Sequence, residues 1–212
     1  HPGFAVDFGE RFLRERAVLA GLHHPGVAQF LDGGQTDGGL PWLAMEIVRG
    51  EPITVYCENR DCPVDERIAL FLQACDAVAY AHQNRVVHRD WKPAHVLIDA
   101  SSEPPRAKLL DFGIAKLIEG GDDMLTGGGN RPLTPAYAAP EQLLGAPITT
   151  ATDVYSLGLV LYQVLVGARA YDINELTASE AEQVVASYMP VAPSSVIADP
   201  ASARRVRGDL DK

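Results

Sequence analysis

Apolar side chains recur along much of the chain at the spacing that places them on one face of an α-helix. This pattern runs from Val64 to His82 and predicts a long amphipathic helix. The segment from Ala151 to Val166 is apolar on almost every face, which predicts a buried helix. A third helical pattern covers about Asp7 to Leu22, and Pro25 ends it.

Shorter apolar runs predict strands in the remaining segments. Val27–Leu31 and Leu40–Val48 are expected to form two strands, joined by a glycine-rich turn over residues 32–39. Short strands are also predicted at Val86–Val87 and at His95–Ile98, and the apolar segment Lys108–Leu110 leads into Asp111. A two-stranded sheet is marginally stable alone, so the first pair must pack against a helix.

Glycine, proline and small polar residues mark the loops. They predict loops over residues 120–130 and 190–200, and the segment 207–212 is expected to begin a further helix. The chain of 212 residues, 47% of them hydrophobic, is long enough for a sizeable core in one or two domains. It contains no internal repeat.

The charge and cysteine content exclude several classes of protein. A net charge of -10 argues against a nucleic-acid binder, which would carry a basic stripe. No apolar run reaches roughly 18 residues and no signal peptide is recognisable, so no membrane contact is expected from this segment. The three cysteines lack the spacing of metal ligands. A reduced, cytoplasmic setting is therefore expected, for a free protein or for the cytoplasmic part of a membrane-anchored one.

The most informative motif is the stretch from His88 to Leu97, which reads H-R-D-W-K-P-A-H-V-L. Asp-Phe-Gly follows at 111–113, Ala-Pro-Glu at 139–141, and D-V-Y-S-L-G begins at Asp153. In this order the motifs resemble the signatures of protein kinases, beginning with the catalytic loop. The segments around two of these motifs, L-L-D-F-G-I-A-K and L-T-P-A-Y-A-A-P-E, are similar in sequence to those of bacterial eukaryotic-like Ser/Thr kinases.

Two upstream segments extend the resemblance over nearly the whole chain. Residues 10–16, followed by Leu-His-His-Pro at 22–25, resemble the regulatory helix of the kinase small lobe, and residues 42–50 resemble its last strand and the hinge. The resemblance implies an α+β, protein-kinase-like fold of two lobes. Residues 1–48 would form a partial small lobe of one helix and about two antiparallel strands. Residues 49–212 would form a mostly helical large lobe, truncated at its C-terminal end.

The resemblance also assigns catalytic roles. Asp90 matches the catalytic base, and Lys92, two residues later, could reach the transferring phosphate. Asp111 matches the Mg²⁺ ligand, since a carboxylate is the hard oxygen donor that Mg²⁺ prefers. The alternative for both aspartates is that they are ordinary surface carboxylates in loops.

An adenine site is implied beside the hinge. Met45 matches the gatekeeper, and Glu46 and Val48 would offer backbone groups to the adenine edge. Leu97 would pack beneath the ring, and Leu110 lies just before the metal motif. Leu97 and Leu110 could equally be core residues, and the two roles are compatible because core side chains line such slots.

Several further positions match regulatory residues. Arg89 suggests control by phosphorylation, because an Arg can pair with a phosphate. Thr134 matches the threonine that docks the substrate, which leaves Thr126 as the candidate phosphorylation site; it could instead be a solvated loop residue. Glu141 is the last residue of Ala-Pro-Glu. In the kinase family the Arg that pairs with this Glu lies further along the sequence, after residue 212. We therefore expect Glu141 to lack that partner, which is costly for a buried carboxylate.

The chain lacks two features that hold the ATP phosphates in kinases. No Lys precedes Lys92, and no glycine-rich strand pair precedes the first predicted helix. We therefore expect the 212 residues to be a piece of a longer kinase, with weak ATP affinity and little turnover by themselves. Glu15 matches the helix glutamate that pairs with the missing Lys; alternatively it is a solvated glutamate.

His95 departs from the family pattern, which has Asn at this position. Asn offers an amide oxygen to the second Mg²⁺ and an N–H₂ group to the backbone near the base. A neutral imidazole nitrogen suits Zn²⁺ or Mn²⁺ better than Mg²⁺. We expect slow Mg²⁺-dependent chemistry, partly restored by Mn²⁺ or by His95→Asn. A tolerated substitution and a one-base sequencing error are the alternatives.

Three functions compete on these grounds. The first is a Ser/Thr protein kinase that uses ATP and Mg²⁺, with Mn²⁺ as an alternative, to phosphorylate a protein hydroxyl. The second is a pseudokinase that binds or scaffolds, which His95 favours. The third is a small-molecule phosphotransferase of related fold, which typically lacks Ala-Pro-Glu and the docking threonine.

Overall fold

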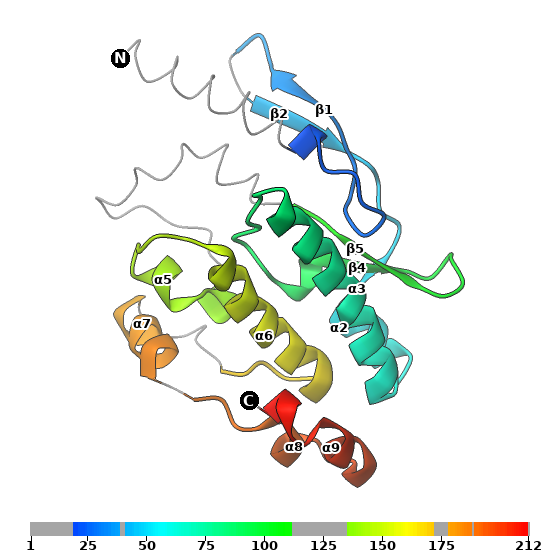
Figure 1. Cartoon of the computed structure of the whole chain (residues 1–212), viewed down its shortest axis with the longest axis vertical. Helices are drawn as coiled ribbons and strands as arrows, with labels where there is room; N and C mark the ends of the chain where they lie inside the picture. The colour runs from blue at the N-terminus through cyan, green and yellow to red at the C-terminus, as the bar shows by residue number, and fades with distance from the viewer. Residues whose placement is uncertain (1–18, 39–40, 112–134, 172–177, 188, 212) are drawn as a thin grey trace.

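One pair of strands lies at one end of the molecule, most helices lie toward the other end, and the remaining strands lie between them, as Figure 1 shows. The hairpin of β1 (Phe30–Gln35) and β2 (Pro41–Met45) lies apart from the helical region that contains α3 (Val64–Gln83) and α6 (Thr150–Val166). This arrangement confirms the α+β class expected from the sequence. The computed structural model describes residues 19–38, 41–111, 135–171, 178–187 and 189–211.

The hairpin is antiparallel, with Phe30 opposite Met45 and Gly33 opposite Leu43. The first half of the glycine-rich segment predicted as a turn, residues 32–35, lies within β1, so the predicted turn was too long. Gly33 can belong to the strand because its missing side chain makes room: a Cβ there would lie 2.8 Å from a methyl carbon of Leu43. The predicted first strand begins late, since Val27 forms only an isolated parallel bridge with Leu109.

A second antiparallel sheet supports the motif region. It has the order β3 (Glu51–Pro52), β4 (Val96–Asp99), β5 (Arg106–Leu109). The predicted strand at 86–87 was wrong: Val86 donates its N–H to the carbonyl of Ala81 and so closes the preceding helix. The strand predicted from His95 begins one residue later, because Pro93–His95 form a 3-10 turn (η1).

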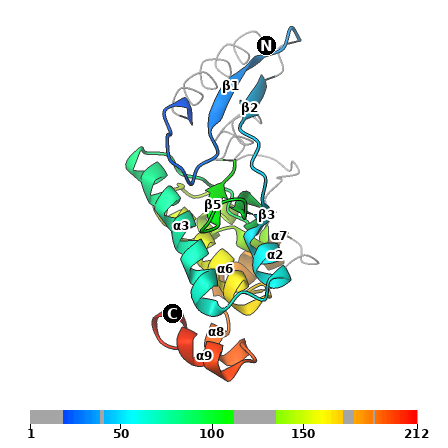
Figure 2. The same ribbon diagram turned by 90° about the vertical axis from the view of Figure 1, so that its right-hand side faces the viewer.

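The two long predicted helices are confirmed almost residue for residue. They are α3 (Val64–Gln83) and α6 (Thr150–Val166), which pack against each other, and α6 also packs against the short α2 (Ile53–Asn59) (Figure 2). The Thr149 hydroxyl accepts the N–H of Ala151 and caps the start of α6. Gly167 ends the same helix at φ 80°, a left-handed conformation that glycine adopts without steric cost.

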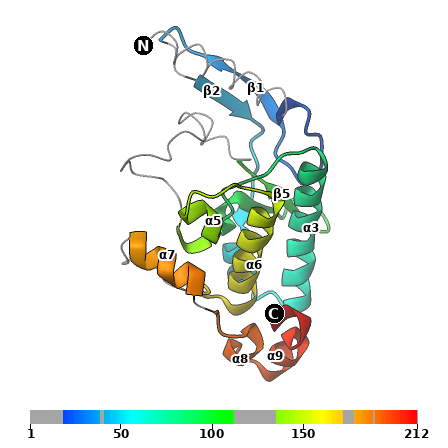
Figure 3. The same cartoon turned by 60° about the vertical axis from the view of Figure 1, so that its left-hand side comes forward.

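Smaller helices complete the structure (Figure 3). The segment 190–200 is not all loop, because Pro193 and Pro200 each occupy the first turn of a helix, where proline has no N–H to lose. In the segment predicted to begin a helix, the described residues 207–211 form only the 3-10 turn η3 (Asp209–Asp211). The remaining elements are η2 (Pro135–Tyr137), α5 (Pro140–Leu143), α7 (Ala178–Ser187), α8 (Pro193–Val196), α9 (Pro200–Val206) and η3 (Asp209–Asp211).

The core lies where α3, α6 and the second sheet meet. Its fully buried side chains include Ile53, Trp91, Val96, Leu109 and Val160. All three cysteines are free thiols. Among the described residues no helix combines the length and apolar character needed to cross a membrane.

Candidate active site

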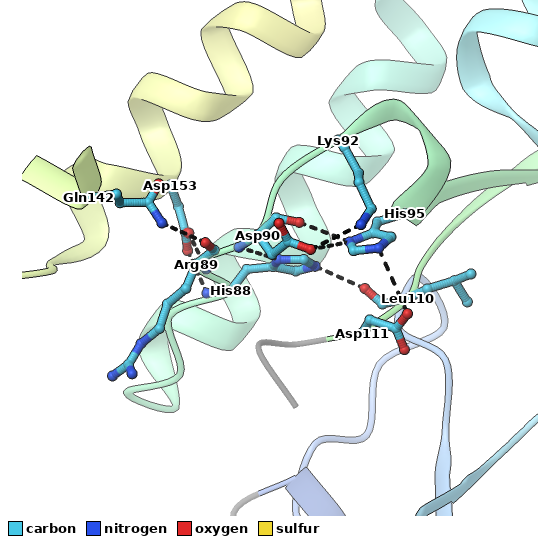
Figure 4. Close-up of polar contacts among 9 residues, drawn as sticks. All are labelled: His88, Arg89, Asp90, Lys92, His95, Leu110, Asp111, Gln142 and Asp153. Atoms are coloured by element: carbon cyan, nitrogen blue, oxygen red, sulfur yellow. Dashed lines mark hydrogen bonds and ion pairs between the residues drawn. The ribbon is translucent and has the colours of Figure 1, made fainter. Parts of the chain in front are cut away.

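The loop from His88 to His95 (the 88–95 loop) is tied to the start of α6 by one buried carboxylate. Asp153 is fully buried, and its Oδ2 and Oδ1 accept the backbone N–H groups of His88 and Arg89 at 2.8 and 2.9 Å. Nε2 of His82, from α3, also lies 2.7 Å from Oδ2 (Figure 4 shows Asp153 beside the loop). A negative charge in the first turn of a helix is favoured by the helix dipole.

The His88 ring links the loop to the end of β5. Its Nε2 lies 2.8 Å from the carbonyl of Leu110, and its Nδ1 lies 3.3 Å from the N–H of Asp90. A carbonyl only accepts, so Nε2 carries the proton and Nδ1 accepts. Burial lowers the pKa of His88 to about 4, which keeps the ring neutral at pH 7. The ring also packs against Trp91, with centroids 4.3 Å apart.

The backbone of Arg89 adopts an unusual conformation that its neighbours hold. Its φ is 67°, in the left-handed region. The buried Gln142 of α5 donates its Nε2–H to the Arg89 carbonyl at 2.7 Å, while its Oε1 accepts the N–H of Ala139 at 3.1 Å. Asp153 and Gln142 thus fix both sides of Arg89, and this constraint aims the next residue, Asp90.

The structure brings Asp90 and Lys92 together. Lys92 Nζ lies 3.1 Å from Asp90 Oδ2, and their side chains are 29% and 22% exposed. A carboxylate and an ammonium group, both partly open to solvent, therefore meet on one rigid loop. Such a pair can hold an anionic group and accept a proton beside it.

His95 lies between Asp90 and Asp111 in Figure 4. Its Nδ1 is 2.8 Å from the Asp90 carbonyl, and its Nε2 is 3.8 Å from Asp111 Oδ2. The His95 side chain is 10% exposed, whereas that of Asp111 is 57% exposed. Burial, and secondly the positive charge of Lys92, lowers the pKa of His95, which favours the neutral ring.

Among the residues expected around adenine, Met45 ends β2, and Glu46 and Val48 lie between β2 and β3. Leu97 belongs to β4, and Leu110 follows β5. The N–H of Glu46 donates to the carbonyl of Gln29, so the Glu46 group that remains for a ligand is its carbonyl. The Glu46 carboxylate pairs with Lys108 of β5. Leu97 alternates with the buried Val96 and Ile98 and is itself half-buried. Met45, Val48 and Leu110 are half-buried as well.

Glu141 has a hydrogen-bond partner, although this partner is not the Arg expected from the kinase family. Its Oε1 accepts the hydroxyl of Thr152 at 2.6 Å, so the carboxylate has a partner within the described residues. Thr152 is fully buried on α6 and follows the Thr149 cap. Three other predicted positions, Glu15, Thr126 and Thr134, lie outside the described residues.

The site offers a divalent ion few protein ligands. Within the residues that the structure describes, no group of three or more His, Cys, Asp and Glu side chains could hold a metal. Asp111 supplies exposed carboxylate oxygens, which fit Mg²⁺ or Mn²⁺. His95 supplies a nitrogen where the amide oxygen of Asn was expected. A bound ion would therefore depend on further oxygens from phosphate groups and water, as is usual for Mg²⁺–nucleotide sites.

Four supporting residues were not identified from the sequence. They are His82, Gln142, Thr152 and Asp153, and all act through contacts between distant segments. Asp153 did stand in a recognised motif, D-V-Y-S-L-G, which could have indicated a role beyond opening a helix. For the other three no local pattern gave a signal.

Comparison with known proteins agrees with this geometry. The protein kinase domain family matches residues 5–203. The chain is 37% identical over 168 residues to serine/threonine-protein kinase pkn2 of Myxococcus xanthus, covering 79% of this chain and 20% of that protein. It is 37% identical over 192 residues to PknJ of Mycobacterium tuberculosis, covering 90% and 32%. PknB of the same species is 38% identical over 166 residues, covering 76% and 26%.

The chain thus spans between a fifth and a third of the length of these curated relatives. The matched region contains the 88–95 loop, Asp111 and the start of α6, the parts that the structure brings together. The chain therefore belongs to the protein kinase family, and within it to the group that resembles the Ser/Thr kinases of bacteria.

Proposed function

We propose that this chain carries the phosphotransfer site of an ATP-dependent protein Ser/Thr kinase. The observation that carries the proposal is the pairing of Asp90 with Lys92 at 3.1 Å on a loop that Asp153 anchors. Phosphoryl transfer depends mainly on positioning and on neutralising charge. A rigid loop that presents a carboxylate and an ammonium group side by side supplies both.

The roles of the chain's own residues follow from their chemistry. Asp90 orients the Ser or Thr hydroxyl and accepts its proton as the oxygen attacks the γ-phosphorus. The bond from that phosphorus to the β–γ bridging oxygen breaks, and ADP leaves with the electron pair. Lys92 stabilises the negative charge of the transferring phosphoryl group.

Asp111 and His95 would hold the divalent ion, which neutralises charge on the phosphate oxygens when bound. The carbonyl of Glu46 and the backbone of Val48 would contact the adenine edge. Met45, Leu97 and Leu110 would line the slot around the ring, since each is half-buried and therefore has surface to offer.

Regulation is proposed at three positions. Arg89 would pair with a phosphate on Thr126, because its backbone is fixed while its side chain keeps some exposure. Thr134 would contact the 88–95 loop and dock the substrate. Phosphopeptide mapping of the active protein tests the first of these, and Thr126 found always unmodified contradicts it.

A pseudokinase is the second candidate, and His95 favours it. The imidazole supplies no oxygen to a metal, so transfer with Mg²⁺ would be impaired while nucleotide binding could persist. A scaffold of this kind would still need the fold that Asp153 stabilises.

Two measurements on the protein that carries this segment, with all of its flanking sequence, distinguish these functions. Transfer of radiolabelled phosphate to a protein substrate is expected, and Asp90→Asn should reduce it by about a thousandfold or more, the upper part of what a positioned base contributes. A thermal shift with nucleotide but no transfer under any divalent ion would favour the pseudokinase. Transfer that survives Asp90→Asn unchanged would overturn the proposed role of Asp90.

A further inference from the structure

One hydrogen bond decides which nitrogen of His95 carries the proton. Nδ1 lies 2.8 Å from the backbone carbonyl of Asp90. A carbonyl oxygen has no proton to give, so Nδ1 must be the donor. In the neutral ring Nε2 then has no proton and presents a lone pair.

That lone pair is directed toward a carboxylate. Figure 4 shows the ring with Nδ1 toward Asp90 and Nε2 toward Asp111, whose Oδ2 is 3.8 Å away. This separation is too long for a hydrogen bond. An unprotonated nitrogen and a carboxylate oxygen also have no proton to share, so their juxtaposition indicates a site for a cation.

The separation is close to what two ligands of one ion require. Ligands at about 2.1 Å from an ion lie roughly 3.0 Å apart at an octahedral angle and roughly 3.4 Å apart at a tetrahedral angle. The observed 3.8 Å must therefore shrink by less than one ångström. Asp111 can make this adjustment because its side chain is 57% exposed, whereas His95 is held in place.

We propose that His95 Nε2 and the Asp111 carboxylate together bind a divalent transition-metal ion, for which Mn²⁺ is the probe. The inference rests on the proposed function, because phosphate oxygens of a bound nucleotide must complete the coordination. It goes beyond that function by naming the ligand atom and the resulting metal preference. The Nδ1 bond to Asp90 acts as the outer-shell contact that orients a metal-binding histidine.

The donor set favours Mn²⁺ over Mg²⁺. Mg²⁺ demands near-octahedral oxygen ligation and gains little from an imidazole nitrogen. Mn²⁺ accepts carboxylate and phosphate oxygens as Mg²⁺ does, and as a transition metal it also accepts nitrogen. The chain therefore keeps the hydrogen bond that an Asn amide would make to Asp90 and replaces the amide oxygen by a nitrogen ligand.

Pulsed electron paramagnetic resonance of Mn²⁺ tests the ligand directly, without turnover. The protein is labelled with ¹⁵N-histidine and mixed with Mn²⁺ and a non-hydrolysable ATP analogue of natural isotope content. The expected spectrum shows coupling of Mn²⁺ to a histidine nitrogen, which changes between ¹⁴N- and ¹⁵N-labelled protein. The coupling should vanish in His95→Asn and persist in His23→Asn, a matched change at an exposed histidine outside the site.

Mn²⁺ titration in the presence of the same analogue gives a second readout. His95→Asn should weaken Mn²⁺ binding by about tenfold or more, whereas His23→Asn should leave it unchanged. Mn²⁺–nucleotide binding without histidine coupling, or with equal affinity in His95→Asn, overturns the inference and leaves the kinase function intact. No binding of the nucleotide with either Mn²⁺ or Mg²⁺ overturns the proposed function, and the inference with it.

Discussion

Asp153 Oδ2 accepts the backbone N–H of His88 at 2.8 Å, although the two residues are 65 positions apart in the sequence. The carboxylate is fully buried and also accepts the N–H of Arg89. Hydrogen bonds to a buried charge are stronger than neutral ones, and losing them leaves the charge uncompensated. This contact therefore couples the position of the 88–95 loop to the stability of α6.

Asp153→Asn should destabilise the chain by about 2–4 kcal/mol. An amide keeps one acceptor oxygen but turns an N–H₂ group toward a backbone N–H, so at least one bond is replaced by a repulsive contact. Urea unfolding followed by circular dichroism measures the difference. Asp65→Asn is the matched control, because Asp65 pairs with Arg205 at the surface with 68% of its side chain exposed. It should change stability by less than about 1 kcal/mol, and an equal loss in both variants contradicts the assigned role.

The bond between Thr152 and Glu141 gives a second prediction. Thr152→Val keeps the size and branching of the side chain but removes the hydroxyl, so Glu141 loses a donor at 2.6 Å. We expect a loss of roughly 1–3 kcal/mol in the free energy of unfolding. Thr152→Ser retains the hydroxyl and should recover most of the loss attributable to the bond. If Thr152→Val costs no more than Thr152→Ser, the hydroxyl contributes no more than the methyl group, and the assigned role of the hydrogen bond is contradicted.

The spacing of apolar residues correctly predicted the elements that a short stretch of sequence is enough to define. The helical periodicity in α3 and α6 was sufficient because each helix buries a continuous apolar face. The order of the motifs also indicated which side chains would meet, and the structure brings Asp90, Lys92, His95 and Asp111 together.

Contacts between distant segments could not be predicted in this way. Val86 has the β-branched character of a strand residue, but its N–H closes α3, and the N–H groups of His88 and Arg89 bind Asp153. Gln142 lies in a short helix, and its role is to donate a hydrogen bond to the carbonyl of Arg89, whose backbone has a positive φ. Such roles depend on tertiary partners, which composition and spacing do not encode.

Burial of His88 predicts a pH-dependent stability. Its pKa is about 4 in the folded chain and 6.5 when unfolded, so between these values the unfolded chain binds a proton that the folded chain does not. The stabilisation is complete above pH 6.5 and is lost as the pH falls toward 4, by on the order of 3 kcal/mol. Asp153, Asp90 and His95 face the same ring and will modify the curve.

Urea unfolding at pH 7, 6 and 5 measures this slope. In His88→Gln the unfolded chain no longer takes up the additional proton at residue 88. The plot of unfolding free energy against pH should therefore be less steep by roughly 1.4 kcal/mol per pH unit in this range. His23→Gln should keep the wild-type slope, since His23 is exposed. Equal slopes in His88→Gln and wild type would show that groups other than His88 cause the acid sensitivity.

His95→Asn should change which metal supports phosphotransfer in the protein that carries this segment with its flanking sequence. The amide restores an oxygen ligand while keeping a donor for the Asp90 carbonyl, so the Mg²⁺-dependent rate should rise by about tenfold or more, equivalent to ~1.4 kcal/mol in the barrier. The rate at saturating Mn²⁺ should change less, because a high Mn²⁺ concentration offsets the weaker Mn²⁺ binding expected in His95→Asn. Asp111→Asn, which weakens the carboxylate site for both ions, should lower both rates together. Initial rates with each ion at saturating nucleotide measure the ratio, and a His95 protein that turns over with Mg²⁺ as fast as its Asn variant contradicts the argument that the imidazole impairs the metal site.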